Sequence, residues 1–123
     1  MIYADIDFIL ALTKKEDWLK KEALKIYEKY KNDIVISSTT LVELMLIAKK
    51  IDYDPLKLIS FALSICELKD DKPEFYFQAC SYQKEYGLGV FDSVHIAKCE
   101  GKIISSDKKF RKIPFLEIVK LGN

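Results

Sequence analysis

The sequence is poor in the residues that separate, cross-link or interrupt a chain. Its 123 residues include only four glycines and three prolines, and no stretch rich in Gly, Pro or Ser marks a linker. The three cysteines are odd in number and far apart, which excludes a disulfide framework and a paired-cysteine metal site. We therefore expect a single domain over residues 1–123, with buried thiols in a reducing compartment.

Long apolar runs and an excess of one charge are also missing. No run approaches the roughly 18 to 20 apolar residues of a membrane span, and no basic region followed by an apolar stretch suggests a signal peptide. We expect a cytoplasmic protein with no membrane partner. The formal net charge of +1 provides no overall field for nucleic acid. Arg111 is the only arginine among 20 basic residues, so contacts with phosphate would depend on lysines.

Short runs rich in β-branched residues alternate with longer segments of helical periodicity. The predicted strands are 2–4, 33–37, 65–69, 102–105 and 116–120. The predicted helices are 17–31, 39–51, 54–65, 72–86 and 92–101. Strands that alternate with crossover helices predict a three-layer α/β/α sandwich with a mostly parallel sheet of four to five strands. In such sheets, sites form at the carboxyl ends of the strands.

Two pairs of polar residues follow predicted strands. Asp5 and Asp7 come directly after the first strand, and Ser105 and Asp107 come at the end of the fourth. A carboxylate at the end of a central parallel strand needs a cation or hydrogen-bond donors to offset its desolvation, as Asp5 would. Asp7 is open to two interpretations, as a helix cap or as part of a metal site. Asp107, taken alone, is typical of a turn residue that binds its own backbone.

Two more acids lie inside predicted helices. Glu43 is the only polar residue in the apolar segment "LVELMLIA", so it is expected to be partly buried and to need a partner. Its position three residues after Thr40 also fits a capping box, with Thr40 as the cap. Asp92 follows the turn "GLGVF" and, taken alone, fits a helix cap. His95 lies one turn after Asp92, where packing or hydrogen bonding is the expected role.

The four motifs together resemble one family. The order "DID", "SSTTLVEL", "GLGVFDSVHIA" and "SSDKKF" is similar to that of the PIN-domain nucleases, which include the VapC-like toxins. The resemblance implies a Mg²⁺- or Mn²⁺-dependent ribonuclease that hydrolyses phosphodiester bonds in RNA. It also implies a homodimer and a possible antitoxin protein as partner. By resemblance, the acidic cluster of the family corresponds to Asp5, Glu43, Asp92 and Asp107.

The resemblance also suggests how these residues would divide the work. We expect Asp5 and Asp92 to be direct metal ligands, with Glu43 and Asp107 acting directly or through water. Ser105 and Asp7 are expected to support the ligands by hydrogen bonds from outside the metal shell. The chain departs from the family pattern in two places: Asp7 replaces the amide or hydroxyl of many members, and Lys109 replaces an acid found in some. These departures leave the number of metal ions open.

Two alternatives belong to other classes of function. A receiver-like signalling domain has similar length and carboxylates after its first strand, although the segment "ICELKDD" offers no clear phospho-acceptor. The second alternative is a catalytically silent PIN-like module that only binds a partner chain. Dependence of RNA cleavage on Mg²⁺ or Mn²⁺ would separate both from a nuclease.

Overall fold

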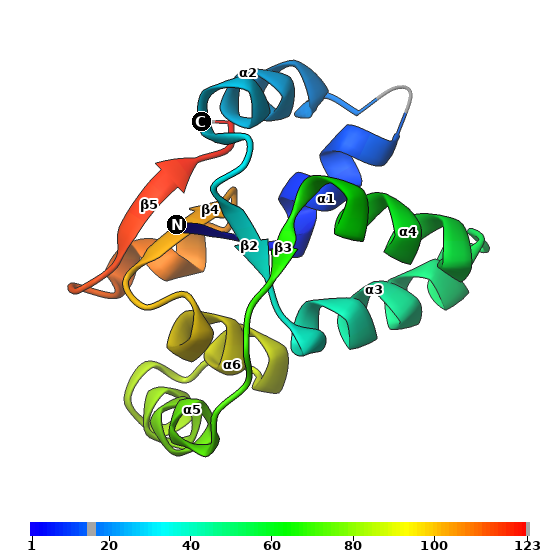
Figure 1. The fold of residues 1–123 in the computed structure, drawn as a ribbon. Coiled ribbons are helices and arrows are strands. Elements are labelled where there is room, and N and C mark those ends of the chain that lie inside the picture. The colour runs from blue at the N-terminus through cyan, green and yellow to red at the C-terminus, as the bar shows by residue number, and fades with distance from the viewer. Residues whose placement is uncertain (15–16, 123) are drawn as a thin grey trace.

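The computed structural model describes residues 1–14 and 17–122. Within them, five strands form one parallel sheet in the order β3-β2-β1-β4-β5 (Figure 1). The strands are β1 (Ile2–Ala4), β2 (Ile34–Ile36), β3 (Glu67–Leu68), β4 (Lys102–Ser105) and β5 (Glu117–Lys120). All five predicted strands are therefore present, and the weakest of them, β3, is reduced to two exposed residues at the edge of the sheet.

Helices cover both faces of the sheet (Figure 1). They are α1 (Ile6–Thr13), α2 (Lys20–Tyr30), α3 (Ser38–Lys50), α4 (Pro55–Ile65), α5 (Pro73–Tyr86) and α6 (Val90–Lys98), with a 3₁₀ turn, η1 (Lys108–Lys112). The first four pack on one face, whereas α6 and η1 pack on the other and α5 lies against α6. The predicted three-layer α/β/α sandwich is thus confirmed.

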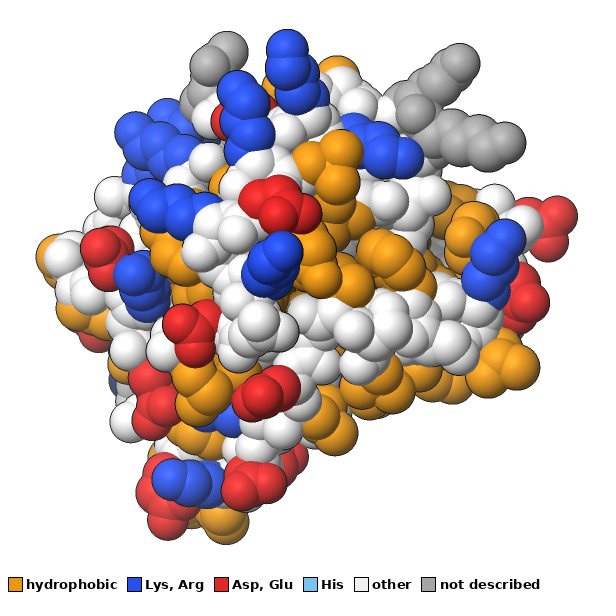
Figure 2. Space-filling model, turned by 45° about the horizontal axis from the view of Figure 1, so that its top comes forward, with side chains coloured by type: hydrophobic (Ala, Val, Ile, Leu, Met, Phe, Trp, Pro, Cys, Tyr) orange, Lys and Arg blue, Asp and Glu red, His pale blue; other side chains and the backbone are white. Residues whose placement is uncertain are grey.

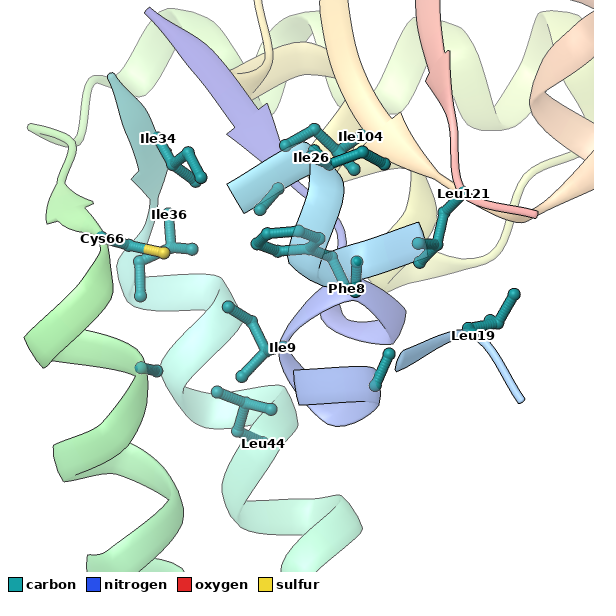
Figure 3. Close-up of a cluster of buried hydrophobic side chains, with 14 of the residues drawn as sticks. Phe8, Ile9, Leu19, Ile26, Ile34, Ile36, Leu44, Cys66, Ile104 and Leu121 are labelled. Carbon is teal, nitrogen blue, oxygen red and sulfur yellow. The ribbon is translucent and has the colours of Figure 1, made fainter. Parts of the chain in front are cut away.

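Alternation along β1 explains how one strand serves both layers. Ile2 and Ala4 point into the larger hydrophobic cluster, which α1 to α4 complete, and Tyr3 points into the smaller one beneath α6. Figure 3 shows the larger cluster, in which Phe8 of α1 lies among side chains from β2, β4 and α3. Burial of this apolar surface is the main stabilising contribution. It holds the start of α1 in place next to the end of β1.

The start of α3 differs from the prediction. The N-cap is Ser37 rather than Thr40, and the Thr40 hydroxyl lies in the first turn, where it accepts a 3.2 Å hydrogen bond from the Ser37 amide. The capping box is therefore formed by Ser37 and Thr40, and the predicted box between Thr40 and Glu43 is wrong. The reason is that β2 ends at Ile36, so the first available hydroxyl caps the helix.

Other local features can be compared directly with the predictions from the sequence. The α6 helix begins at Val90 after the N-cap Gly89, so Asp92 lies in the first turn and does not cap the helix. Gly87 ends α5 in the left-handed conformation, so the helix stops at Tyr86, where the predicted range 72–86 ends. Of the three cysteines, Cys80 is exposed, which contradicts the expectation that all the thiols are buried. None of the helices in the described part of the chain is long and apolar enough to cross a bilayer.

Candidate functional site

The ends of β1 and β4 bring Asp5 and Ser105 together. Asp5 is the N-cap of α1, and one of its carboxylate oxygens accepts a 2.9 Å hydrogen bond from the Ile6 amide. The other oxygen accepts a 2.8 Å hydrogen bond from the Ser105 hydroxyl, whose oxygen in turn accepts one of 3.0 Å from the Asp107 amide. One hydroxyl thus orients the Asp5 carboxylate and fixes the backbone from which Asp107 projects.

Asp7 lies in the first turn of α1 and faces the same chain segment. Its Oδ2 accepts hydrogen bonds from the amide, at 2.7 Å, and from the hydroxyl of Ser106. Its Oδ1 is buried and has no hydrogen-bond partner among the described residues. A buried carboxylate oxygen without a donor is costly, and a cation or a metal-bound water is a suitable partner for it.

The protonation of these two carboxyls is strongly perturbed. Burial raises the pKa of Asp5 to about 7, and repulsion from Asp7 adds to this, while His95 and the hydrogen bonds from Ser105 and the Ile6 amide oppose it. Burial also raises the pKa of Asp7, against the hydrogen bonds from Ser106. The carboxyl ends of β1 and β4 therefore hold negative charge that the chain itself only partly compensates.

A lysine bridges the next two acids. The Lys109 ammonium lies 3.4 Å from a carboxylate oxygen of Asp92 and 3.8 Å from one of Asp107. Asp107 also caps η1 by accepting a hydrogen bond from the Lys109 amide, as its interpretation as a turn residue predicted. The acids Asp107 and then Asp92 raise the pKa of Lys109. Because the Lys109 side chain is 65 % exposed, solvent screens these two ion pairs and each of them is weak.

Glu43 is connected through a buried histidine. A 2.7 Å hydrogen bond joins its Oε1 to Nε2 of His95, and a second of 2.7 Å joins Nδ1 of His95 to the Tyr3 hydroxyl. The Tyr3 oxygen also lies 2.7 Å from the Ser37 hydroxyl and 3.2 Å from that of Thr40. Glu43 therefore has a partner, as its apolar surroundings predicted, but the partner comes from α6.

These contacts define an open acidic edge rather than a closed cage. Asp7 lies in the electrostatic field of both Asp5 and Asp107. Asp92 is linked to Asp107 through Lys109, and Glu43 is linked to Tyr3 of β1 through His95. In the described residues, no three Asp, Glu, His or Cys side chains come close enough to enclose a metal ion. An all-oxygen set of this kind fits Mg²⁺ or Mn²⁺, which use one or two carboxylates and complete their shell with water and substrate phosphate.

Sequence reasoning missed two residues of this edge. Ser106 binds Asp7, and the only signal for it is the doubled serine in "SSD". Tyr3 anchors His95, and its signal is a hydroxyl inside the otherwise apolar strand "IYA". A cavity of about 580 Å³ between α5, α6 and Phe115 includes none of the acids of this edge in its walls.

Comparisons with known proteins agree with this architecture. Over nearly its whole length the chain resembles a chain from a toxin-antitoxin complex of Klebsiella pneumoniae, with a TM-score of 0.78 and 21 % identity, covering 100 % of this chain and 99 % of that one. A second similar structure is VapBC2 from Rickettsia felis bound to a DNA fragment from their promoter, with a TM-score of 0.71 and 22 % identity over 99 % of this chain and 100 % of that one. A comparison with curated protein sequences gives no significant match.

The strand order decides against the receiver-like alternative. Receiver domains have the order 2-1-3-4-5, whereas this sheet has the order β3-β2-β1-β4-β5. The model of the PIN domain matches residues 2–116. The match spans β1 to β4 and includes all the acids of the edge, and it ends just before β5. The chain therefore belongs to the PIN-domain family.

Proposed function

We propose that this chain is a divalent-metal-dependent endoribonuclease whose site is the acidic edge. The observation that carries the proposal is the pair Asp5 and Asp7, two carboxyls of raised pKa at the end of the first strand. Asp5 is buried, and Asp7 has one buried oxygen without a hydrogen-bond partner in the described part of the chain. Two carboxylates that repel each other in a buried position destabilise the chain unless a cation compensates them. In a PIN-domain chain, a metal ion with a catalytic role is the cation that accounts for them.

The ligand assignment follows from the chemistry of the donors. Asp5 and Asp92 would hold Mg²⁺ or Mn²⁺ directly, and Glu43 and Asp107 would act directly or through water. The bound ion would supply a Lewis acid for the phosphate and lower the pKa of the attacking water. Ser105 orients Asp5 by its hydrogen bond, and Asp7 extends the negative charge beside it, so both tune the ligands without acting on RNA.

Binding of RNA would depend on individual lysines rather than on a strong overall field. Figure 2 shows basic, acidic and apolar side chains interspersed over one face of the molecule, in agreement with a formal net charge of +1. Lys109 is placed to change partners, because it is exposed and lies at the acids. If Asp92 and Asp107 hold a cation, the Lys109 ammonium would be available to contact a phosphate of the RNA.

We further propose that the nuclease is the toxin of a toxin-antitoxin pair, acts in the cytoplasm as a homodimer and is restrained by an antitoxin protein. The support is the likeness of fold to chains of toxin-antitoxin complexes over the full length of this chain. Co-expression with the product of a neighbouring small gene, followed by size-exclusion chromatography with light scattering, tests both the partner and the homodimer.

The activity is tested by cleavage of a labelled structured RNA in Mn²⁺, comparing the parent with Asp5→Asn and Asp92→Asn. Both substitutions keep the size of the side chain and remove its charge. Asp33→Asn is the matched control, because Asp33 is exposed and lies just before β2, at the amino ends of the strands and away from Asp5. We expect cleavage by the parent and the control, and loss of cleavage in the two site variants. Absence of cleavage by the parent on several RNAs, or equal cleavage by all four proteins, would favour the silent binding module.

A further inference from the structure

His95 connects four separate parts of the fold. Its ring is completely buried, with 0 % exposure. One nitrogen contacts Glu43 on α3 and the other contacts Tyr3 on β1, and the Tyr3 hydroxyl reaches Ser37 at the end of β2 and Thr40 on α3. A buried side chain whose two polar atoms both have partners is held in one orientation. His95 therefore presents its Nε2 to Glu43 in a fixed direction.

The direction of these hydrogen bonds follows from the groups involved. A carboxylate only accepts, so Nε2–H of His95 donates to Glu43. Burial raises the pKa of Tyr3 above that of an ordinary tyrosine, so the side chain keeps its proton. In a neutral ring the phenol donates to Nδ1, and in a charged ring Nδ1 donates to the phenol, which then donates to Ser37 or Thr40. Glu43 receives the Nε2 proton in both states.

Glu43 depends on this contact for its orientation. Its side chain is 17 % exposed, and His95 is its only hydrogen-bond partner in the described part of the chain. A glutamate side chain has three rotatable bonds, so without a partner its carboxylate would adopt several positions. Since His95 lies three residues after Asp92 on α6, the helix that presents Asp92 also holds Glu43.

We propose that His95 is a positioning residue for the acidic edge: its Nε2–H fixes the Glu43 carboxylate toward the metal position, and Tyr3 fixes the ring of His95. The inference rests on the proposed metal-dependent nuclease and extends it to two residues that touch neither the ion nor the RNA. It predicts that the geometry of the donor to Glu43, and not the imidazole as such, determines metal affinity.

Two substitutions of His95 separate the effect of the donor's position from the effect of the imidazole ring itself. In His95→Gln, the amide nitrogen takes about the position of Nε2 and still reaches Glu43. In His95→Asn, the shorter side chain places its amide near Nδ1, so it faces Tyr3 and leaves Glu43 without a donor. Loss of such a supporting partner typically lowers metal affinity by roughly 10 to 100-fold. We expect this loss for His95→Asn, a loss of at most about threefold for His95→Gln, and an intermediate loss for Tyr3→Phe.

The readouts are chosen to distinguish positioning from general destabilisation. Mn²⁺ affinity is measured by titration calorimetry, and the Mn²⁺ concentration for half-maximal cleavage is measured separately from the KM for RNA. Ile96→Val is the control, because Ile96 is buried on the same helix, next to His95, but has an apolar side chain that makes no hydrogen bond to Glu43 or Tyr3. Thermal unfolding establishes that each variant is folded. A variant that is merely destabilised lowers the active fraction without shifting the Mn²⁺ midpoint.

The outcomes distinguish the two proposals. A raised Mn²⁺ midpoint and weaker Mn²⁺ binding in folded His95→Asn, with recovery in His95→Gln and no shift in Ile96→Val, supports the positioning role. If the parent binds Mn²⁺ and cleaves RNA while His95→Asn does both equally well, the positioning role is wrong and the nuclease stands. If the parent neither binds Mn²⁺ nor cleaves, both proposals are wrong.

Discussion

Replacement of Asp5 by Asn should stabilise the metal-free protein, even though it removes a proposed metal ligand. Asp5 is 7 % exposed and lies beside Asp7. Burial, and then repulsion from Asp7, raise its pKa from 3.8 to about 7. The folded state therefore favours the protonated carboxyl. The stability from this preference is present below 3.8 and is lost as the pH rises through about 7.

The size of the effect follows from the shift. A difference of about three pKa units corresponds to about 4 kcal/mol at 1.36 kcal/mol per unit. The repulsion is shared with Asp7, and rearranging the hydrogen bond from Ser105 costs about 1 kcal/mol. We therefore expect Asp5→Asn to raise the free energy of unfolding by about 2 kcal/mol near pH 8 in a chelator, or roughly 8 °C in Tm for a chain of this size.

The assay is thermal unfolding in EDTA between about pH 4 and pH 8. The parent should lose stability across this range relative to Asp5→Asn, and the two curves should converge at the acidic end, where the parent carboxyl is protonated. Asp33→Asn, with an exposed carboxyl, should follow the parent. Added Mn²⁺ should stabilise the parent and not Asp5→Asn, because binding to the folded state alone raises Tm. An Asp5→Asn protein less stable than the parent at pH 8 in EDTA would refute the conclusion that the charge of Asp5 is uncompensated in the metal-free protein.

Three further predictions concern other parts of the molecule. Lys109→Ala removes the ammonium that lies on Asp92 and Asp107, so calorimetry should show tighter Mn²⁺ binding, whereas unchanged or weaker binding would mean that Lys109 does not compete with the ion. Phe8→Ala deletes a fully buried ring in the larger cluster (Figure 3). It should lower the free energy of unfolding, measured by urea titration, by about 3 to 5 kcal/mol. A loss below about 1 kcal/mol would contradict this packing. A thiol reagent should modify Cys80 alone in the native protein, because the other two cysteines are buried, and mass spectrometry after digestion would reveal any second modified thiol.

Much of the architecture was predictable because it depends on short-range pattern. Runs of β-branched residues identified the five strands within one or two residues, and the alternation with helical segments identified the parallel three-layer fold. The positions of Asp5 and Asp107 just after β1 and β4 were predicted for the same reason, since both strand ends are visible in the sequence. The resemblance of four ordered motifs to the PIN family agrees with the match over residues 2–116.

Features that depend on a choice between neighbouring residues were predicted less well. Ser37 and Thr40 can both cap a helix, and the choice between them depends on where β2 stops pairing with β1. Asp92 suits a cap equally well, but the helix begins earlier, at Val90. Each error is a shift of two or three residues at a helix start, where local propensities differ by only about 1 kcal/mol.

By itself, the sequence determined that charge would stand at the ends of two buried strands, because hydrophobic periodicity and strand boundaries are local properties of the chain. It did not determine which side chains each carboxylate would contact. Tyr3 and His95 are 92 positions apart, and His95 and Glu43 are 52 apart. Only the packing of α6 against α3 and the sheet places them within hydrogen-bond distance, because a contact of about 2.7 Å depends on the relative position of whole elements rather than on the propensity of any residue.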